Sequence, residues 1–156
     1  MGREKAPFPH ALGMICTQAC AKECKRGEVS EAMSIRASKR YAAEHDTGSY
    51  WKGRGKQLPD TGKKVCVVGG GVAGLTAAYY LRKQGHAVTV KEELPTVGGM
   101  MSYGIPAYRL PRNIVAEEAQ VIADQGVVME TGVRVDNPVE LLKEYDAVLM
   151  AVGNHK

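Results

Sequence analysis

Aromatic residues are scarce in this 156-residue sequence, which has one tryptophan and one phenylalanine. No stretch approaches the roughly 20 apolar residues that a membrane span needs, and the opening residues lead into no apolar secretion signal. The scarcity of aromatics and the lack of a compact Lys/Arg tract disfavour nucleic-acid binding, which uses base stacking and basic patches. We therefore expect a cytoplasmic protein with neither a membrane span nor a nucleic-acid partner.

Charge is distributed unevenly along the chain. Residues 1–64 carry 13 basic and 7 acidic side chains, whereas residues 65–156 carry 8 basic and 10 acidic ones. The length allows one substantial core with some chain left over. The basic first part is typical of a segment that meets an acidic protein partner or a polyanionic cofactor.

A β-branched apolar run that ends in glycine is the main motif of the sequence. Gly69, Gly71 and Gly74 follow residues 65–68 in G-x-G-x-x-G spacing, and residues 75–81 continue at helical period. These glycines allow a tight turn, close approach to a pyrophosphate, and packing of the new helix on its strand. The motif predicts a dinucleotide site in a βαβ unit, and a glycine turn without a ligand is the alternative.

An acidic residue follows the next expected strand, residues 87–90. Glu92 lies 23 positions after the first motif glycine and 18 after the last. This spacing brackets the distance at which an acid reaches a ribose hydroxyl in dinucleotide-binding folds. Glu92 is therefore a candidate ligand of the adenosine ribose.

Three cysteines recur at intervals of four: Cys16, Cys20 and Cys24. A disulfide is disfavoured in a cytosolic protein, and zinc is disfavoured because neither the spacing nor a following His pair matches zinc fingers. An iron–sulfur cluster fits better, with three unligated thiols on a small helix as the alternative. Cys66, inside the expected first strand, is interpreted as a small buried hydrophobe.

The remaining pattern alternates helices, strands and loops. Ser30 is the expected N-cap of a helix that ends near His45, and residues 46–62 are interpreted as a linker. The expected later elements are a functional loop over 93–112, a helix over 113–125, short strands over 127–130 and 133–135 paired as a hairpin, a helix start at Asn137-Pro138, and a last strand over 147–152.

Several motifs occur together and in order: Gly13-Met14-Ile15-Cys16 with Cys20 and Cys24, Lys39-Arg40-Tyr41, Gly62-Lys63-Lys64-Val65, the glycine motif, Glu92, Gly98-Gly99-Met100, Gly104-Ile105-Pro106, Arg109-Leu110-Pro111, and Asp146-Ala147-Val148 closing on Ala151-Val152-Gly153. In this combination the chain resembles the FAD- and NADPH-dependent oxidoreductase module of the glutamate synthase small subunit and of the N-terminal part of dihydropyrimidine dehydrogenase.

The resemblance implies a Rossmann-type parallel α/β sheet that binds FAD over residues 63–156, preceded by a helical iron–sulfur segment over residues 1–45. It implies that Glu92 lies on the adenosine ribose, that the Val133 segment lies on the adenine, and that the segments around Gly98 and Gly104 lie along the flavin. The implied FAD contacts are Gly69, Gly71, Val72, Ala73, Gly74, Glu92, Gly98, Gly99, Met100, Gly104, Ile105, Pro106, Arg109, Val133, Ala151 and Gly153. Cys16, Cys20 and Cys24 are the expected iron–sulfur ligands, of a 4Fe-4S type. In the family these positions divide between two clusters whose other ligands come from an upstream cysteine group, so the three need not share one centre here.

Two departures from the family shape the functional hypothesis. Family members continue into an NADPH-binding domain and a returning flavin-domain segment, and two-cluster members have an upstream cysteine group and a fourth cysteine where Leu12 stands. We therefore expect an electron-transfer module that reaches NADPH only through another domain or subunit. The alternatives are a non-catalytic adaptor that docks through its basic arm, and a stand-alone NAD(P)-dependent enzyme.

Overall fold

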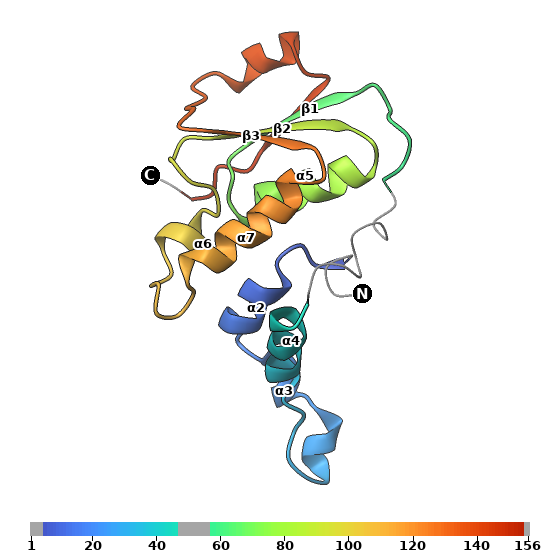
Figure 1. Cartoon of the computed structure of the whole chain (residues 1–156), viewed down its shortest axis with the longest axis vertical. Coiled ribbons are helices and arrows are strands. Elements are labelled where there is room, and N and C mark those ends of the chain that lie inside the picture. The colour runs from blue at the N-terminus through green and yellow to red at the C-terminus, as the bar shows by residue number, and fades with distance from the viewer. Residues whose placement is uncertain (1–4, 47–56, 155–156) are drawn as a thin grey trace. The chain divides into compact units, whose positions relative to one another are not determined.

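The computed structural model describes residues 5–46 and 57–154. The chain divides into two compact units, Met1–Arg54 and Gly55–Lys156, and Figure 1 labels their elements. This division falls inside the segment that we interpreted as a linker, most of which, residues 47–56, lies outside the described residues. Its last part belongs to the second unit, because Leu58 donates its N–H to the Lys83 carbonyl (2.9 Å) and Thr61 to the Gly85 carbonyl (3.0 Å).

The first unit is made of short helices. They are α2 (Pro9–Ile15), α3 (Ala19–Lys22), the 3₁₀ helix η1 (Lys25–Glu28) and α4 (Ile35–Glu44). Gly13 of α2 faces α4 so closely that an added Cβ would lie 2.8 Å from the Cα of Arg40. A small residue is therefore required where these two helices pack.

Helix α4 begins later than predicted. Ser34, not Ser30, precedes its first residue, Ile35. Ser30 instead forms a local turn, in which its N–H bonds to the Arg26 carbonyl (2.9 Å) and its hydroxyl accepts from the Arg26 guanidinium (3.1 Å). The serine hydroxyl therefore has a local partner, and it caps no helix.

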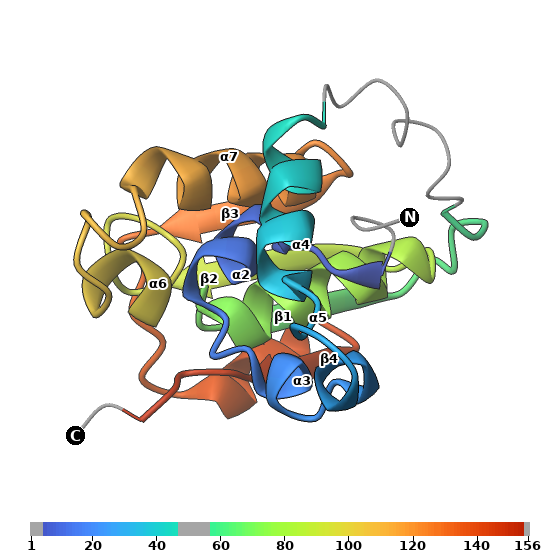
Figure 2. The ribbon, with the colours of Figure 1, turned by 90° about the horizontal axis from the view of Figure 1, so that it is seen from below.

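The second unit is built on a four-stranded parallel sheet in the order β3-β2-β1-β4. Its strands are β1 (Lys64–Val68), β2 (Ala87–Glu92), β3 (Val127–Thr131) and β4 (Ala147–Met150), and Figure 2 shows them in this order. Its helices are α5 (Val72–Lys83), α6 (Met100–Tyr103), α7 (Arg112–Ala123) and the 3₁₀ helix η2 (Pro138–Lys143). Figure 1 shows α5 and α7 on one face of the sheet. The Rossmann-type parallel α/β fold expected from the sequence is confirmed.

Alternate residues of β1 face opposite sides of the sheet. Val67 faces α5, where it lies next to Gly74, while Cys66 and Val68 pack with Tyr145 on the other face. Cys66 is fully buried, as predicted, and burial raises the pKa of its thiol. Both faces of the central strand are therefore covered, as a parallel sheet requires.

The predicted hairpin over residues 127–135 does not form. β3 pairs in parallel with β2, and residues 133–135 form no strand. The chain instead continues along the end of β2, where Gly132 donates to the Leu94 carbonyl (3.1 Å) and Val133 to the Glu92 carbonyl (2.9 Å). The residues after β3 therefore extend its pairing with β2 instead of turning back onto β3.

Asn137 caps a helix as predicted, since its side chain accepts the N–H of Val139 at 3.2 Å. The element that it begins is the 3₁₀ helix η2 rather than an α-helix. Over the described ranges, no helix has both the length and the apolar composition that crossing a bilayer requires.

Candidate dinucleotide site and cysteine segment

The turn between β1 and α5 depends on glycine at two positions. Gly69 has φ +106°, a conformation that favours glycine, and an added Cβ there would collide with the carbonyl oxygen of Ala151. An added Cβ on Gly74 would collide with the carbonyl oxygen of Gly69 and lie 3.2 Å from a methyl of Val67. These two glycines make the tight turn and the close contact between helix and strand that the motif predicts.

Gly71 differs from the other two motif glycines. Its φ is −76°, which any residue adopts, and the nearest atom to an added Cβ is the Cα of Gly99 at 3.8 Å. Nothing within the described protein therefore requires glycine at this position. The open space at Gly71 is what a ligand that approaches the backbone needs.

The N-terminus of α5 opens into this space. Gly71 is its N-cap residue and provides no side-chain cap. Among the described residues, the N–H groups of Val72, Ala73 and Gly74 have no hydrogen-bond acceptor. Unpaired N–H groups and the positive end of the helix dipole together favour an anion, such as a diphosphate.

Glu92 lies at the carboxyl end of β2, beside this turn. The residue is 8% exposed, and its carboxylate accepts the N–H of Gly70 at 2.6 Å and that of Leu94 at 2.9 Å. A carboxylate has about four acceptor positions, so it can accept further hydroxyl donors. Contact with a ribose stays a prediction, but the structure does place Glu92 at the glycine turn.

The loop after β2 runs back across the turn. Gly98 donates its N–H to the Gly70 carbonyl at 2.7 Å, and Gly99, with φ +52°, faces Gly71 so closely that an added Cβ would lie 2.8 Å from its Cα. Met100 then starts α6 and is 66% exposed. Gly98, Gly99 and the glycine motif are therefore brought together.

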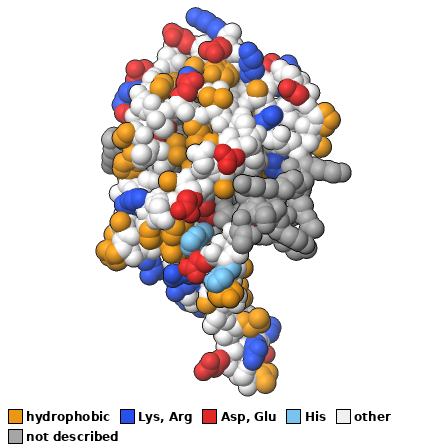
Figure 3. Space-filling view, in the orientation of Figure 1, with side chains coloured by type: hydrophobic (Ala, Val, Ile, Leu, Met, Phe, Trp, Pro, Cys, Tyr) orange, Lys and Arg blue, Asp and Glu red, His pale blue; other side chains and the backbone are white. Residues whose placement is uncertain are grey.

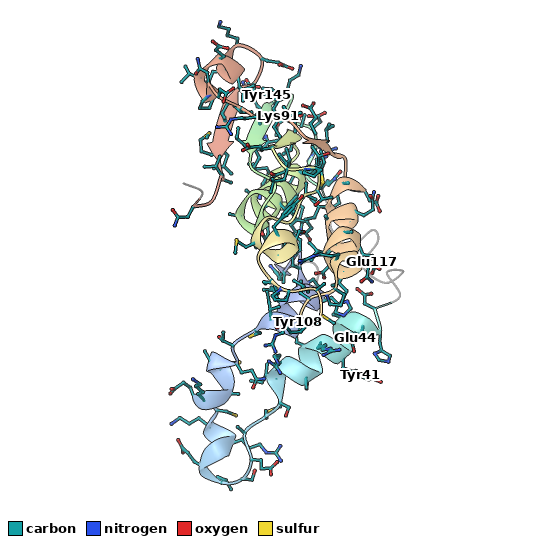
Figure 4. All side chains as sticks on the ribbon, turned by 90° about the vertical axis from the view of Figure 1, so that its left-hand side faces the viewer. Tyr41, Glu44, Lys91, Tyr108, Glu117 and Tyr145 are labelled. Atoms are coloured by element: carbon teal, nitrogen blue, oxygen red, sulfur yellow. The ribbon has the colours of Figure 1, made fainter. Side chains whose placement is uncertain are left out.

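The residues after α6 form a compact turn. The N–H of Ile105 bonds to the Met100 carbonyl (3.0 Å), and that of Arg109 to the Pro106 carbonyl (2.9 Å). Gly104 is packed against the Met100 side chain. Figure 4 labels Tyr108, which is 91% exposed. These hydrogen bonds stay within the turn and do not reach the glycine motif, so its expected place along a flavin stays a prediction.

The last predicted contacts come from two other strand ends. Val133 bonds to the backbone of Glu92, and Ala151 donates to the Val68 carbonyl at 2.7 Å while it touches Gly69. Gly153 follows with φ +74°. These segments meet the glycine motif at the carboxyl edge of the sheet, where open α/β sheets bind ligands.

The three clustered cysteines do not form a metal site by themselves. Cys20 in α3 is exposed, and Cys16 and Cys24 are half-buried. In the described part of the chain, no group of three or more His, Cys, Asp or Glu residues is arranged to hold a metal ion. The three thiolates do not converge among these residues, so the residues present do not fit a cluster on their own.

Local backbone groups nevertheless favour a thiolate in this segment. N–H groups of Met33 and, less strongly, Arg26 lower the pKa of Cys24. Lys25 and Glu28 of this segment form an ion pair (2.9 Å), and Figure 3 shows side chains of both charges at the lower end of the view. The exposure of Cys20 and the lowered pKa of Cys24 suit reaction or ligation better than packing.

Comparison with known proteins places this geometry in a family. The family model described as "NAD(P)-binding Rossmann-like domain" matches residues 67–148. The chain belongs to this family. The matched range begins in β1 and ends in β4, so it spans the glycine turn, Glu92 and the loop across the turn.

Relatives include two oxidoreductase subunits. The chain is 37% identical to the NADP(+)-dependent formate dehydrogenase subunit beta of Moorella thermoacetica, with 98% of this chain and 25% of that protein covered. It is 34% identical to the small chain of glutamate synthase [NADPH] of Bacillus subtilis, with 96% and 31% covered. The chain thus spans about a quarter to a third of the length of these relatives.

A solved structure agrees with the fold. A mutant of FprA from Mycobacterium tuberculosis is 27% identical, with a TM-score of 0.54, and the match covers 62% of this chain and 23% of that one. The likeness to the glutamate synthase small subunit stated from the motifs is confirmed, as is the fold of this Rossmann-like domain.

Sequence reasoning missed Gly70, which lies between two motif glycines. Its N–H holds Glu92 and its carbonyl holds Gly98, and an added Cβ would lie 2.9 Å from a methyl of Val97. The x positions of G-x-G-x-x-G carry no residue requirement, so the motif could not single it out. Only the folded structure shows that Gly70 is hydrogen-bonded both to Glu92 and to Gly98.

A cavity of about 590 Å³ also lies in this unit, away from the glycine turn. It lies between α5 and β4, and its lining includes Tyr80, Leu81, Val148 and Leu149. None of the predicted cofactor contacts lines it. This hollow and the dinucleotide motif of the Rossmann-like domain are therefore separate features.

Proposed function

We propose that this chain is the FAD-binding module of an NAD(P)H-linked oxidoreductase. The observation that carries the proposal is that the N–H groups of Val72, Ala73 and Gly74 have no acceptor in the part of the chain that the structure describes, beside the open space at Gly71. A diphosphate supplies the acceptors that these donors lack. The family that the chain belongs to and its similarity to oxidoreductase subunits support the same class of ligand.

In this proposal each part of the site has a distinct role. The start of α5 binds the diphosphate, Gly71 lets it approach the backbone, and Glu92 accepts hydrogen bonds from the adenosine ribose. The Val133 segment covers the adenine. Gly153 and Ala151 bring a second strand end to the cofactor.

The loop from residue 98 to residue 109 is proposed to lie along the flavin. Gly98 and Gly99 hold its first part against the turn, and residues 104–106 with Arg109 form its second part. When bound, FAD supplies hydride and single-electron transfer. The role of the loop is to orient the ring and to exclude water from it.

Nicotinamide chemistry is proposed to come from elsewhere. The relatives named for NADPH or NADP(+) are about three to four times longer than the part that this chain matches. We assign NADPH binding to another domain or subunit, and we place the complex in the cytoplasm. The chain alone is then expected to bind FAD without oxidising NADPH.

The cysteine segment is proposed to share a cluster with a partner. Since the three thiols do not converge among the described residues, Cys16, Cys20 and Cys24 would need ligands from another chain or segment to hold a 4Fe-4S centre. Their exposure and the lowered pKa of Cys24 support ligation rather than packing. No electron path is assigned through this segment.

Replacing Gly71 by valine tests the flavin site. The new side chain enters the open space, so FAD affinity should fall by more than about tenfold, or 1.4 kcal/mol, while circular dichroism shows the fold retained. Gly27→Val is the matched control, because an added Cβ there meets only the Ala32 Cβ at 3.9 Å; it should keep the flavin spectrum. Undiminished FAD binding by Gly71→Val would place the cofactor elsewhere.

The same spectra test whether NADPH oxidation needs another domain or subunit. NADPH added to the flavin-loaded chain should leave the flavin band unchanged. Rapid bleaching would instead favour a stand-alone NAD(P)-dependent enzyme. A chain that binds no FAD at all would favour the adaptor hypothesis.

A further inference from the structure

The carboxyl end of β2 and the segment after β3 lie side by side next to the glycine turn. Val133 bonds to the Glu92 carbonyl at 2.9 Å, while the Glu92 carboxylate accepts from Gly70 at 2.6 Å. Glu93 and Arg134 come directly after these paired residues. They therefore flank the proposed position of the adenosine ribose, and any role assigned to them there rests on the proposed dinucleotide site.

Arg134 is engaged on two sides by carboxylates. Its Nη1 lies 2.7 Å from the Oε1 of Glu93, and its Nε lies 2.8 Å from the Oδ1 of Asp136. Hydrogen bonds to Asp136 and Glu93 raise the pKa of the guanidinium. Two of its five N–H donors are used in this way, and because Nε is one of them, the side-on pair of Nε and Nη2 is not free to bind a phosphate in a bidentate manner.

The charge around the proposed ribose position is negative. Glu92, Glu93 and Asp136 are three carboxylates against one guanidinium, that of Arg134. The ammonium of Lys91 adds no free positive charge here, because it pairs with Glu130 on the face of the sheet that carries Cys66 and Tyr145. A phosphate monoester carries about −1.5 to −2 charges at pH 7, so an adenosine 2′-phosphate would meet net repulsion here.

We propose that Glu93 and Asp136 set the cofactor specificity of this site by occupying Arg134, so that the site accepts a dinucleotide with a free adenosine 2′-hydroxyl and rejects NADP(H). A nearby arginine with free donors is the usual way in which a Rossmann site accepts a 2′-phosphate. The description of the matched family, "NAD(P)-binding", names both NAD and NADP. We expect the ion pairs of Arg134 to make this site select against the 2′-phosphate of NADP. FAD and NAD have the accepted chemistry.

The test uses ADP and adenosine 2′,5′-bisphosphate, each titrated calorimetrically into the full chain at low ionic strength. Because the bisphosphate carries one phosphate at the 5′ end where ADP carries two, the role of the 2′-phosphate is measured as the change in the affinity ratio between the unmodified protein and its variants. The unmodified protein should prefer ADP by about tenfold. The double variant Glu93→Gln/Asp136→Asn should reduce that preference by about tenfold or reverse it, while ADP affinity changes less than about twofold.

Two further variants separate the effect of removing negative charge from the effect of freeing the Arg134 N–H donors. Adding Arg134→Gln to the double variant should abolish part of the gain in bisphosphate affinity, because the donors are gone. Glu117→Gln removes one exposed carboxylate from α7 (Figure 4) and should leave the preference unchanged. Glu93, Arg134 and Asp136 are each more than half exposed, so these variants should fold.

The outcomes distinguish this inference from the proposed function. An unchanged preference in the double variant, or tighter binding of the bisphosphate by the unmodified protein, overturns the specificity role alone. Failure of ADP to bind overturns the dinucleotide site and this role together. A preference that falls on Glu93→Gln/Asp136→Asn and is partly restored by Arg134→Gln supports both.

Discussion

The glycine turn and the cysteine segment hold their backbones in different ways. At residues 69–74 the chain is fixed by close backbone contacts, since Gly69 and Gly74 leave no room for a side chain. At residues 16–24 the helices are short, no residue of α3 or η1 is buried, and the three thiols stay apart. The glycine turn is therefore fixed by contacts within the protein, whereas such contacts do not bring the three thiols of the cysteine segment together.

The difference follows from the forces that each motif uses. Steric exclusion and backbone hydrogen bonds act within a few residues and need no ligand. Thiolates repel one another, and a metal centre supplies the energy that gathers them. The geometry of a glycine motif can therefore be recognised from the folded backbone alone, while the ligand geometry of a cysteine motif depends on its metal or partner.

The largest expected effect is a difference in the free energy of unfolding between substitutions at Gly74 and at Gly71. Gly74→Ala should destabilise the second unit by about 3 kcal/mol or more, because its Cβ would collide with the Gly69 carbonyl. Gly71→Ala should change the free energy of unfolding by less than about 1 kcal/mol, because the space is open. Urea denaturation followed by circular dichroism measures both.

Equal destabilisation by Gly74→Ala and Gly71→Ala would contradict this prediction, since it would mean that packing rather than a ligand requires glycine at position 71.

The first unit provides a control for the effect of a steric collision. Gly13→Ala meets the Arg40 backbone at 2.8 Å and should destabilise the contact between α2 and α4 without altering the second unit.

A smaller effect is expected from the thiols. Cys16, Cys20 and Cys24 should react with iodoacetamide in the native chain, whereas Cys66 should react at least about a hundredfold more slowly, because it must await opening of the core. Mass spectrometry of alkylated peptides gives the four rates.

Anaerobic reconstitution with iron and sulfide sharpens this result. Because the three thiols do not converge among the described residues, any cluster in the isolated chain should be labile and be lost on desalting, and Cys20→Ser should weaken it further. A stable zinc stoichiometry without bound sulfide would contradict the iron–sulfur proposal. Full protection of the thiols before any metal is added would contradict the open arrangement of this segment.

The smallest effect concerns the amino end of β1, opposite the glycine turn. The Lys63 ammonium (2.8 Å) and then the Lys64 N–H (2.8 Å) lower the pKa of Asp146 below its ordinary value. A lowered carboxyl pKa stabilises the fold above the unfolded value, and this stability is lost as pH falls through the folded value. Asp146→Asn should therefore lower Tm by a few degrees at most at pH 7.

That difference in Tm between Asp146→Asn and the unmodified protein should vanish at a pH below the folded pKa of the carboxyl group. Because Lys63 is exposed, its share of the effect should shrink in high salt. A difference that persists at low pH would show that the packing of the side chain, rather than its charge, matters.

The sequence predicted well wherever a residue has one physical role. Val65–Val68 as a buried strand, Cys66 as a core residue and Asn137 as a cap were all confirmed. Ser30 failed as a helix cap because serine bonds to whichever backbone or side chain is near, and here that is Arg26. The prediction of a hairpin over residues 127–135 was wrong because a short apolar run does not specify the strand with which it pairs; here β3 pairs with β2.

The sequence by itself determined the order of strands and helices, the glycine turn and the neighbourhood of Glu92, because these depend on sterics and periodicity over a few residues. Only the tertiary structure decided that Gly70 joins Glu92 to Gly98, that Val133 runs beside Glu92, and that Arg134 lies between Glu93 and Asp136. The longer of these contacts join residues 22 to 41 positions apart. Pairing at such separation depends on how the strands assemble, which no local pattern specifies.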